Sequence, residues 1–323
     1  MYQKREIKNE LSWSVTRAQL FQSCPRAYYY TYYGSWKGWE IEAPEETRLL
    51  YRLKKLTTMP IWAGSIVHDL LKGTLERAQA TGTIPDLETL QNAARAKMRE
   101  GWLQTINQEW LKNPSKAVNL SELYYGAGEN YGTCRKLPKE ETDTILRRVM
   151  DCLDNFTHSP ILKEIFAVPA ANWKPIDTLA YFMVGDIKVY CAIDFAFEDQ
   201  EGGLHIIDWK TGNENPRTLR QQLACYARYA VDTWGYPVDK LILQGVFLRD
   251  GGRVSQYTVN QELLDSVCPE IEKSYQAMQA RLTSVEDNTA EEDNFPPRPS
   301  ENTCSSCNFR QVCPMTKDLM GRL

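Results

Sequence analysis

The sequence predicts an α/β chain, because segments of strand character alternate with segments of helical periodicity. Strand character dominates residues 166–208, where apolar and β-branched residues form short runs. C-terminal to this region the pattern predicts a helix, two strands joined by Gly251-Gly252 and a second helix, at 218–233, 241–248, 253–259 and 261–282.

The first half of the chain is expected to be mainly helical. A short helix capped by Ser14 or Thr16 should end before Pro25, and the tyrosine-rich segment 27–33 should pack most of its rings into a core. Further helices are predicted where apolar residues recur at helical spacing, at 62–75, 85–111 and 140–156. We interpret residues 80–160 as a helical insertion placed before the strand-rich region.

Composition restricts the class of protein more than it identifies a function. The chain has 323 residues, and its 42% hydrophobic and 25% charged residues are ordinary for a globular protein. No run approaches the ~20 apolar residues that span a bilayer, and the N-terminus lacks the apolar part of a signal peptide. We therefore expect a cytoplasmic protein without a membrane partner. The net charge of −4 gives no support of its own for nucleic-acid binding.

The stretch from 192 to 226 contains the residues with the clearest chemistry. Asp208 and Lys210 are two positions apart in an apolar run, so as strand residues they share one face, which we expect to be solvated. Asp194 ends an earlier apolar run, and a hairpin across the polar turn 198–203 would bring it near Asp208. Two carboxylates and a lysine beside a core predict a divalent metal site, with Lys210 facing a phosphate or a water.

Three of the nine cysteines have a spacing that indicates a metal or cluster site. Cys304, Cys307 and Cys313 lie close together near the end of the chain, and a fourth ligand is needed to complete such a site. Four thiolates can hold a [4Fe-4S] cluster or a structural zinc ion, and spacing alone does not separate the two.

These motifs together resemble the PD-(D/E)XK nucleases, specifically the RecB-like branch that carries a four-cysteine iron–sulphur cluster, as in nucleases of CRISPR adaptation and AddB-type nucleases. The resemblance implies a restriction-endonuclease-like core with a mixed central sheet flanked by helices. It implies Asp194 and Asp208 as Mg²⁺ or Mn²⁺ ligands and Lys210 as the catalytic lysine. It implies Cys24 as the fourth thiolate ligand, and it favours [4Fe-4S] over zinc. One departure is Cys191-Ala-Ile-Asp194-Phe195, where the family often has Gly-x-Ile-Asp-Arg.

The resemblance also assigns three helical residues. His68 with Gly64 matches a Gly-x-x-x-His motif whose histidine is a further metal ligand. Gln222 and Tyr226 match a Gln-x-x-x-Tyr motif, and because they lie one helical turn apart we expect them to contact the DNA backbone.

The implied function is metal-dependent hydrolysis of DNA phosphodiester bonds, of exonuclease type, in repair, recombination, phage defence or CRISPR adaptation. We expect one nuclease domain over 1–323, with segment 301–316 pairing with Cys24. DNA with single strands or free ends is the expected substrate, and a helicase or another repair or defence protein is a candidate partner. The alternative is a non-catalytic DNA-binding or scaffold subunit of a larger complex.

Overall fold

The computed structural model describes residues 8–128, 130–213 and 215–316. The described residues divide into two compact units, and each is treated separately below. The first unit comprises the residues up to 56, 183–189 and those from 269 onward, and the second comprises 57–182 and 190–268. No helix in the described part of the chain is long and apolar enough to cross a membrane.

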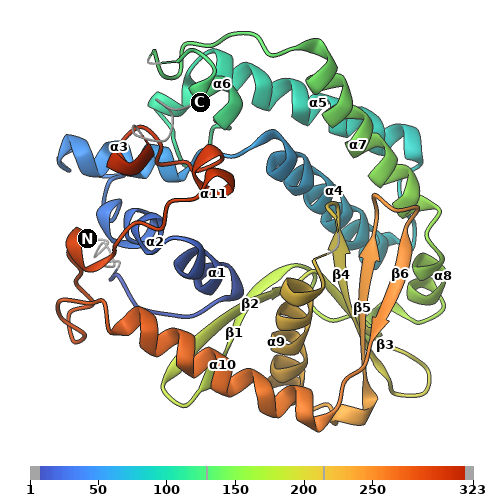
Figure 1. Ribbon diagram of the computed structural model, residues 1–323. Coiled ribbons are helices and arrows are strands. Elements are labelled where there is room, and N and C mark those ends of the chain that lie inside the picture. The colour runs from blue at the N-terminus through green and yellow to red at the C-terminus, as the bar shows by residue number, and fades with distance from the viewer. Residues whose placement is uncertain (1–7, 129, 214, 317–323) are drawn as a thin grey trace, which may run out of the picture. The chain divides into compact units, whose positions relative to one another are not determined.

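Three long helices form the helical part of the second unit: α4 (Met59–Thr81), α5 (Leu87–Ile106) and α7 (Lys139–Thr157). They pack against one another pairwise (Figure 1). Thr58 and Asp86 cap α4 and α5, because each side chain accepts a backbone N–H of the first turn. The predicted helices at 62–75, 85–111 and 140–156 are therefore confirmed.

Shorter elements complete this part of the chain. They are the 3₁₀ turn η2 (Glu109–Leu111), α6 (Ser121–Tyr125), α8 (Pro160–Phe166), the 3₁₀ turn η3 (Ala170–Asn172) and the 3₁₀ turn η4 (Val238–Lys240). Strand structure begins only at Thr178, not at residue 166 as predicted, because α8 starts with a proline at its first helical position and buries three apolar residues.

The central sheet is mixed, with strand order β3-β4-β5-β6. Its strands are β3 (Phe195–Glu198), β4 (Leu204–Lys210), β5 (Leu241–Phe247) and β6 (Arg253–Tyr257). The pairs β3–β4 and β5–β6 are antiparallel, whereas β4 and β5 are parallel. The predicted hairpin ahead of β4 is confirmed, with Phe195 opposite Ile207 and Glu198 opposite Leu204.

A separate two-stranded sheet precedes the central one. It consists of β1 (Thr178–Val184) and β2 (Ile187–Ile193), joined at Gly185, whose φ of +56° suits a tight hairpin turn. The boundary between the two units runs through this hairpin. Asp194 stands between the end of β2 and the start of β3, so two strands fix its position.

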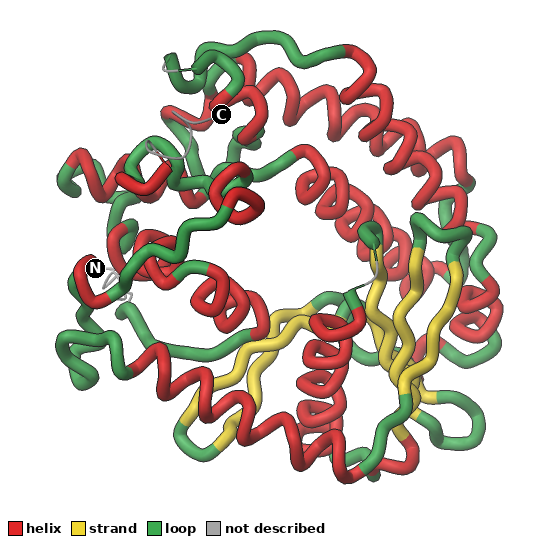
Figure 2. The backbone as a smooth tube through the Cα atoms, in the orientation of Figure 1, coloured by secondary structure: helices red, strands yellow, loops and turns green. Residues whose placement is uncertain are grey.

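One helix, α9 (Pro216–Trp234), lies beside β4 and β5 in Figures 1 and 2. Asn215 caps it, proline occupies its first position, and Gly235 ends it with a φ of +74°. Its buried residues recur at helical spacing and confirm the predicted stripe of Leu219, Leu223, Tyr226 and Ala230.

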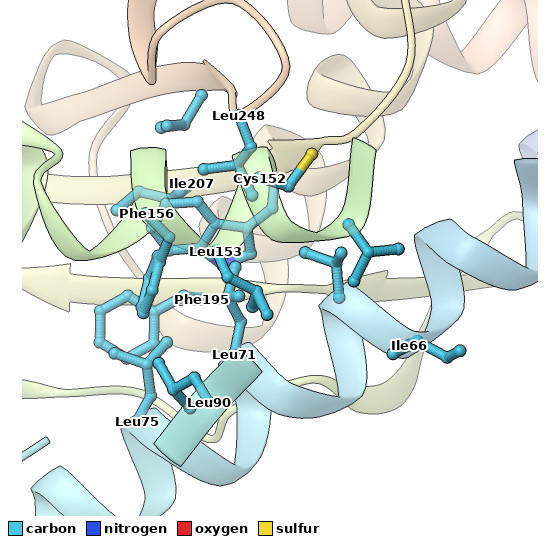
Figure 3. Close-up of a cluster of buried hydrophobic side chains, with 14 of the residues drawn as sticks. Ile66, Leu71, Leu75, Leu90, Cys152, Leu153, Phe156, Phe195, Ile207 and Leu248 are labelled. Carbon is cyan, nitrogen blue, oxygen red and sulfur yellow. The ribbon is translucent and has the colours of Figure 1, made fainter. Parts of the chain in front are cut away.

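A cluster of buried apolar residues joins the helices of the second unit to the sheet. Figure 3 shows Leu71 and Leu75 of α4 near Phe156 of α7 and Phe195 and Ile207 of the sheet, and each of these five residues is at most 1% exposed. Trp209 packs edge-on against Phe156, with ring centres 5.5 Å apart. This core fixes β4, and therefore the face that carries Asp208 and Lys210, relative to α4 and α7.

The first unit is built from short helices and loops. It contains α1 (Val15–Ser23), α2 (Pro25–Tyr29), the π-helix η1 (Tyr30–Gly34), α3 (Glu45–Lys54), η5 (Glu292–Asn294) and α11 (Glu301–Ser305). Helix α10 (Gln261–Gln279) runs into it from the second unit. The prediction that the tyrosines pack into a core is confirmed, since the rings of Tyr28, Tyr29 and Tyr33 lie 5.5 to 6.2 Å from that of Phe295.

Candidate active site

The two aspartates predicted as metal ligands lie on neighbouring strands. Because Phe195 pairs with Ile207, the preceding residue Asp194 falls beside Asp208. Asp194 Oδ2 accepts the backbone N–H of Trp209 at 2.8 Å. This hydrogen bond ties the Asp194 carboxylate to the strand that carries the second carboxylate.

Asp208 is buried, which contradicts the expectation of a solvated face. Only 1% of its side chain is exposed, compared with 27% for Lys210. The Lys210 ammonium lies 2.6 Å from Asp208 Oδ2 and is the nearest compensating charge. Burial and the charge of Asp194 nevertheless raise the pKa of Asp208 to about 7, so this carboxylate lacks full compensation.

Gln222 and Tyr226 close a ring of contacts around this pair. Lys210 donates to Gln222 Oε1 at 2.9 Å, and Gln222 Nε2 donates to the Tyr226 hydroxyl at 2.6 Å. The hydroxyl in turn donates to Asp208 Oδ1 at 3.5 Å. Tyr226 is only 3% exposed, so its side chain faces the carboxylate instead of the DNA backbone expected from the sequence.

His68 reaches the same cluster from α4. Its Nδ1 lies 3.5 Å from Asp194 Oδ1. Burial lowers the pKa of His68, but the hydrogen bond to Asp194 and the charges of Asp194 and Asp208 outweigh burial and raise it. Gly64 lies one turn earlier, and a Cβ there would approach Thr211 Oγ1 to 2.9 Å. Glycine therefore permits the close approach of α4 to the end of β4.

A pocket of about 480 Å³ opens beside these residues. It is lined by Pro60, Ile61, Gly64, Ser65, His68, Asp69, Arg148, Thr211 and Gly212. Arg148 of α7 was not identified from the sequence, and it donates twice to the Thr211 carbonyl, from Nε at 3.0 Å and Nη2 at 2.6 Å. The sequence holds one signal for this contact, which is that Thr211 follows the Asp-x-Lys motif. Nothing in the sequence predicts that α7 packs against this loop.

The four cysteines predicted as ligands all belong to the first unit, and they line one pocket. Backbone N–H groups approach two of the thiols: Arg298 N lies 3.5 Å from Cys24 Sγ, and Phe309 N lies 3.4 Å from Cys307 Sγ. Burial raises the pKa of Cys307 to about 11, and the neighbouring Cys24, Cys313 and Cys304 add to the effect. Sulphur atoms that affect one another's ionisation in this way lie close together.

The profile of the PD-(D/E)XK nuclease superfamily matches residues 12–314. This chain belongs to that superfamily. Among solved structures it is similar to one described as "Crystal structure of SSO0001", with 16% identity over 55% of this chain and 78% of the other and a TM-score of 0.29, which carries no argument about function. A search of curated proteins finds no match.

PD-(D/E)XK nucleases usually use Mg²⁺ or Mn²⁺, and the donor set fits a hard cation. Asp208 Oδ2 is buried, and no donor among the described residues meets it in hydrogen-bonding geometry. The Lys210 ammonium lies 2.6 Å from this oxygen, but Asp194 adds a second carboxylate whose charge a bound cation would offset. Within the described residues, however, no three His, Cys, Asp or Glu side chains are already arranged to hold one metal ion.

The structure thus brings together all six residues predicted for the catalytic site. They are His68, Asp194, Asp208, Lys210, Gln222 and Tyr226. In this PD-(D/E)XK nuclease, the residues that the sequence did not identify are Arg148 and Thr211, which position the loop after β4.

Proposed function

We propose that this chain is a Mg²⁺- or Mn²⁺-dependent deoxyribonuclease that hydrolyses DNA phosphodiester bonds. One observation carries the proposal: the buried carboxylate of Asp208 lies beside Asp194, and the Lys210 ammonium, 2.6 Å from Asp208 Oδ2, does not fully offset the two charges. A fold rarely keeps two carboxylates together in a buried position unless a cation offsets their charge.

In this proposal Asp194, Asp208 and His68 hold the metal ion. When bound, the ion would polarise the phosphate and favour ionisation of a water molecule. Lys210 is 27% exposed, so its ammonium can reach from Asp208 toward a phosphate or an attacking water. Arg148 keeps the Thr211 loop fixed at the rim of the pocket where the substrate would enter.

Gln222 and Tyr226 are positioning residues in this reading. Gln222 accepts from Lys210 and donates to Tyr226, so it sets where the ammonium points. Tyr226 holds Asp208 Oδ1, and the metal ion would bind at the other carboxylate oxygen, which lies next to the Lys210 ammonium.

We also propose that Cys24, Cys304, Cys307 and Cys313 hold a [4Fe-4S] cluster, with structural zinc as the alternative. The support is that all four thiols line one pocket and that backbone N–H groups approach two of them. Such N–H···S contacts are typical around cluster and zinc thiolates. Burial raises the pKa of Cys307, so a bound cation is needed to favour its thiolate form.

The RecB-like motifs favour an exonuclease-type activity in DNA repair, recombination, phage defence or CRISPR adaptation. The motifs do not distinguish these pathways, and the proposed partner is a helicase or another protein of the same process. None of the nine cysteines, all of which lie in the described part of the chain, forms a disulfide, which supports the proposed cytoplasmic location.

The decisive test is cleavage of end-labelled single- and double-stranded DNA in Mg²⁺, Mn²⁺ or EDTA. We expect metal-dependent cleavage by the wild type and a loss of at least about 100-fold in Lys210→Ala, because the group that stabilises charge at the phosphate is gone. Lys163→Ala, an exposed lysine of the same unit, is the matched control and should retain activity. Wild-type protein that binds DNA but cleaves none in either metal would favour the scaffold alternative.

A further inference from the structure

A second pocket in the second unit plays no part in the chemistry proposed above. It lies among α4, α5, α7 and the segment before α7, and its volume is about 480 Å³. We call it the basic pocket. Its lining combines cationic side chains with tryptophan and methionine. Neither a packing defect in a core nor an ordinary solvated surface requires both kinds of side chain.

The charge of the basic pocket is almost entirely of one sign. Five cationic residues line it, Arg95, Arg99, Arg135, Lys136 and Lys139, and Asp143 is its single carboxylate. Asp143 lies 3.4 Å from Lys139, and that pairing leaves the other four cations without a carboxylate partner among the described residues. A concentration of positive charge in a chain of net charge −4 indicates an anionic ligand.

The apolar part of the pocket suits a flat ring. Trp62 and Trp102 both line it, together with Met59 and Met98. Gly101 allows this arrangement, because a Cβ there would lie 2.6 Å from the Trp62 ring. Trp102 is only partly buried, so a ligand can reach its indole. Every nucleobase has a face that stacks on such a ring.

The same two helices carry the basic pocket and the candidate active site. On α4, Trp62 lines the basic pocket and His68 lines the catalytic one, and the two are about 9 Å apart along the helix axis. On α7, Leu146 lines the basic pocket and Arg148 the catalytic one. The two pockets are therefore close enough for one strand to reach both.

We propose that the basic pocket binds a base and its flanking phosphates in the single-stranded DNA segment that leads to the catalytic aspartates. This inference rests on the proposed nuclease function and specifies its substrate as single-stranded. The methylene groups of arginine and lysine often cover apolar surface. That role alone does not explain why nearly all the charges that line this pocket are positive. In duplex DNA the bases are stacked and paired, so only a single strand can offer a free base face to Trp102.

The test compares two double variants that remove the same charge. Arg95→Ala/Arg99→Ala removes cations from the basic pocket, whereas Arg77→Ala/Arg147→Ala removes exposed cations of α4 and α7 outside both pockets. Affinity for labelled single-stranded and duplex oligonucleotides of the same sequence is measured by fluorescence anisotropy in EDTA, over a range of salt concentrations. We expect the pocket variant to bind about tenfold or more weakly and its salt slope to fall by about 1.4, the value for two phosphate contacts on a single strand.

A second arm tests stacking on the indole. Trp102→Phe should bind close to wild type because it keeps an aromatic face, whereas Trp102→Leu should lose about fivefold or more. Circular dichroism establishes that each variant is folded.

Equal affinities of the two double variants for single strands would overturn the inference, as would an equal loss for duplex and single-stranded DNA. The cleavage assay separates these outcomes from the proposed function. Pocket-dependent binding without any cleavage would support the basic pocket and overturn the nuclease, whereas cleavage with pocket-independent binding would overturn the basic pocket alone.

Discussion

At the scale of single residues, the buried carboxylate of Asp208 is the most informative feature of the site. Its surroundings favour the neutral form, although Lys210 lies 2.6 Å away. Burial and the charge of Asp194 raise its pKa to about 7 in the folded protein, above the ordinary value of 3.8. The folded state therefore binds a proton at Asp208 more tightly than the unfolded state does.

This pKa shift predicts how stability depends on pH. The contribution of Asp208 to stability is greatest below pH 4 and is lost as pH rises through about 7. In EDTA, Asp208→Asn should therefore be more stable than wild type at pH 8, by up to about 4 kcal/mol, because the pKa rises from 3.8 to about 7 and each pKa unit is worth about 1.4 kcal/mol. The difference should shrink at pH 5.

Thermal unfolding at both pH values measures this difference, and Asp239→Asn, at an exposed position, is the control. A wild type that is more stable than Asp208→Asn at pH 8 would mean that Lys210 compensates the carboxylate fully.

At the scale of elements, α4 contributes to the site through one close approach. Gly64 faces Thr211, and the next turn of the helix carries His68. Alanine favours a helix over glycine by about 1 kcal/mol. The contact with Thr211 is therefore what disfavours a Gly64→Ala substitution.

We predict that Gly64→Ala lowers nuclease activity about tenfold or more while changing the free energy of unfolding by less than about 1 kcal/mol. The new methyl group would push α4 from the end of β4 and separate His68 from Asp194. Gly73→Ala on the same helix is the matched control, since a Cβ there meets nothing within 4 Å.

Activity and denaturant unfolding are measured on both variants. Adding Thr211→Ala to Gly64→Ala should restore activity, since it removes the oxygen that the methyl group would meet. Failure of this rescue would show that Gly64 acts in another way.

Much of the architecture followed from local pattern. Periodicity predicted α4, α5, α7 and α9, and the polar turn before β4 predicted the hairpin that pairs Asp194 with Asp208. Period-two alternation also placed Asp208 and Lys210 on one face, but it could not show that this face is covered.

What the sequence did not reveal depends on contacts between distant segments. Three features depend on segments that only tertiary packing brings together. They are the burial of Tyr226 against Asp208, the hydrogen bonds from Arg148 to the Thr211 carbonyl, and the basic pocket. A polar helix residue such as Tyr226 has the same local pattern whether it faces DNA or a carboxylate.

At the scale of the whole molecule, residues from both ends of the chain line the cysteine pocket in the first unit. Cys24 stands between α1 and α2, and the other three cysteines lie in and after α11. If a metal cofactor joins them, the local order of this unit depends on metal.

We predict that Cys24→Ser loses the bound cofactor and lowers the thermal midpoint by about 5 °C or more, because a ligand to a structural metal is removed. Cys268→Ser is the matched control, since Cys268 also precedes a proline but lies outside the pocket.

Metal content, visible absorbance under anaerobic conditions and thermal unfolding are measured. Brown protein containing iron supports the cluster, and colourless protein with stoichiometric zinc supports the alternative. A Cys24→Ser protein that keeps its full metal content would exclude Cys24 as a ligand.

The division of the first unit into three segments has a consequence for synthesis on the ribosome. Its N-terminal segment ends at residue 56, but the remainder of the unit includes residues 183–189 and those from 269 onward. At about 5 to 20 residues per second, the ribosome takes on the order of 10 to 40 seconds to synthesise the residues between 56 and 269. During this time the tyrosine-rich helices lack Phe295 as a packing partner, whereas the second unit can already fold.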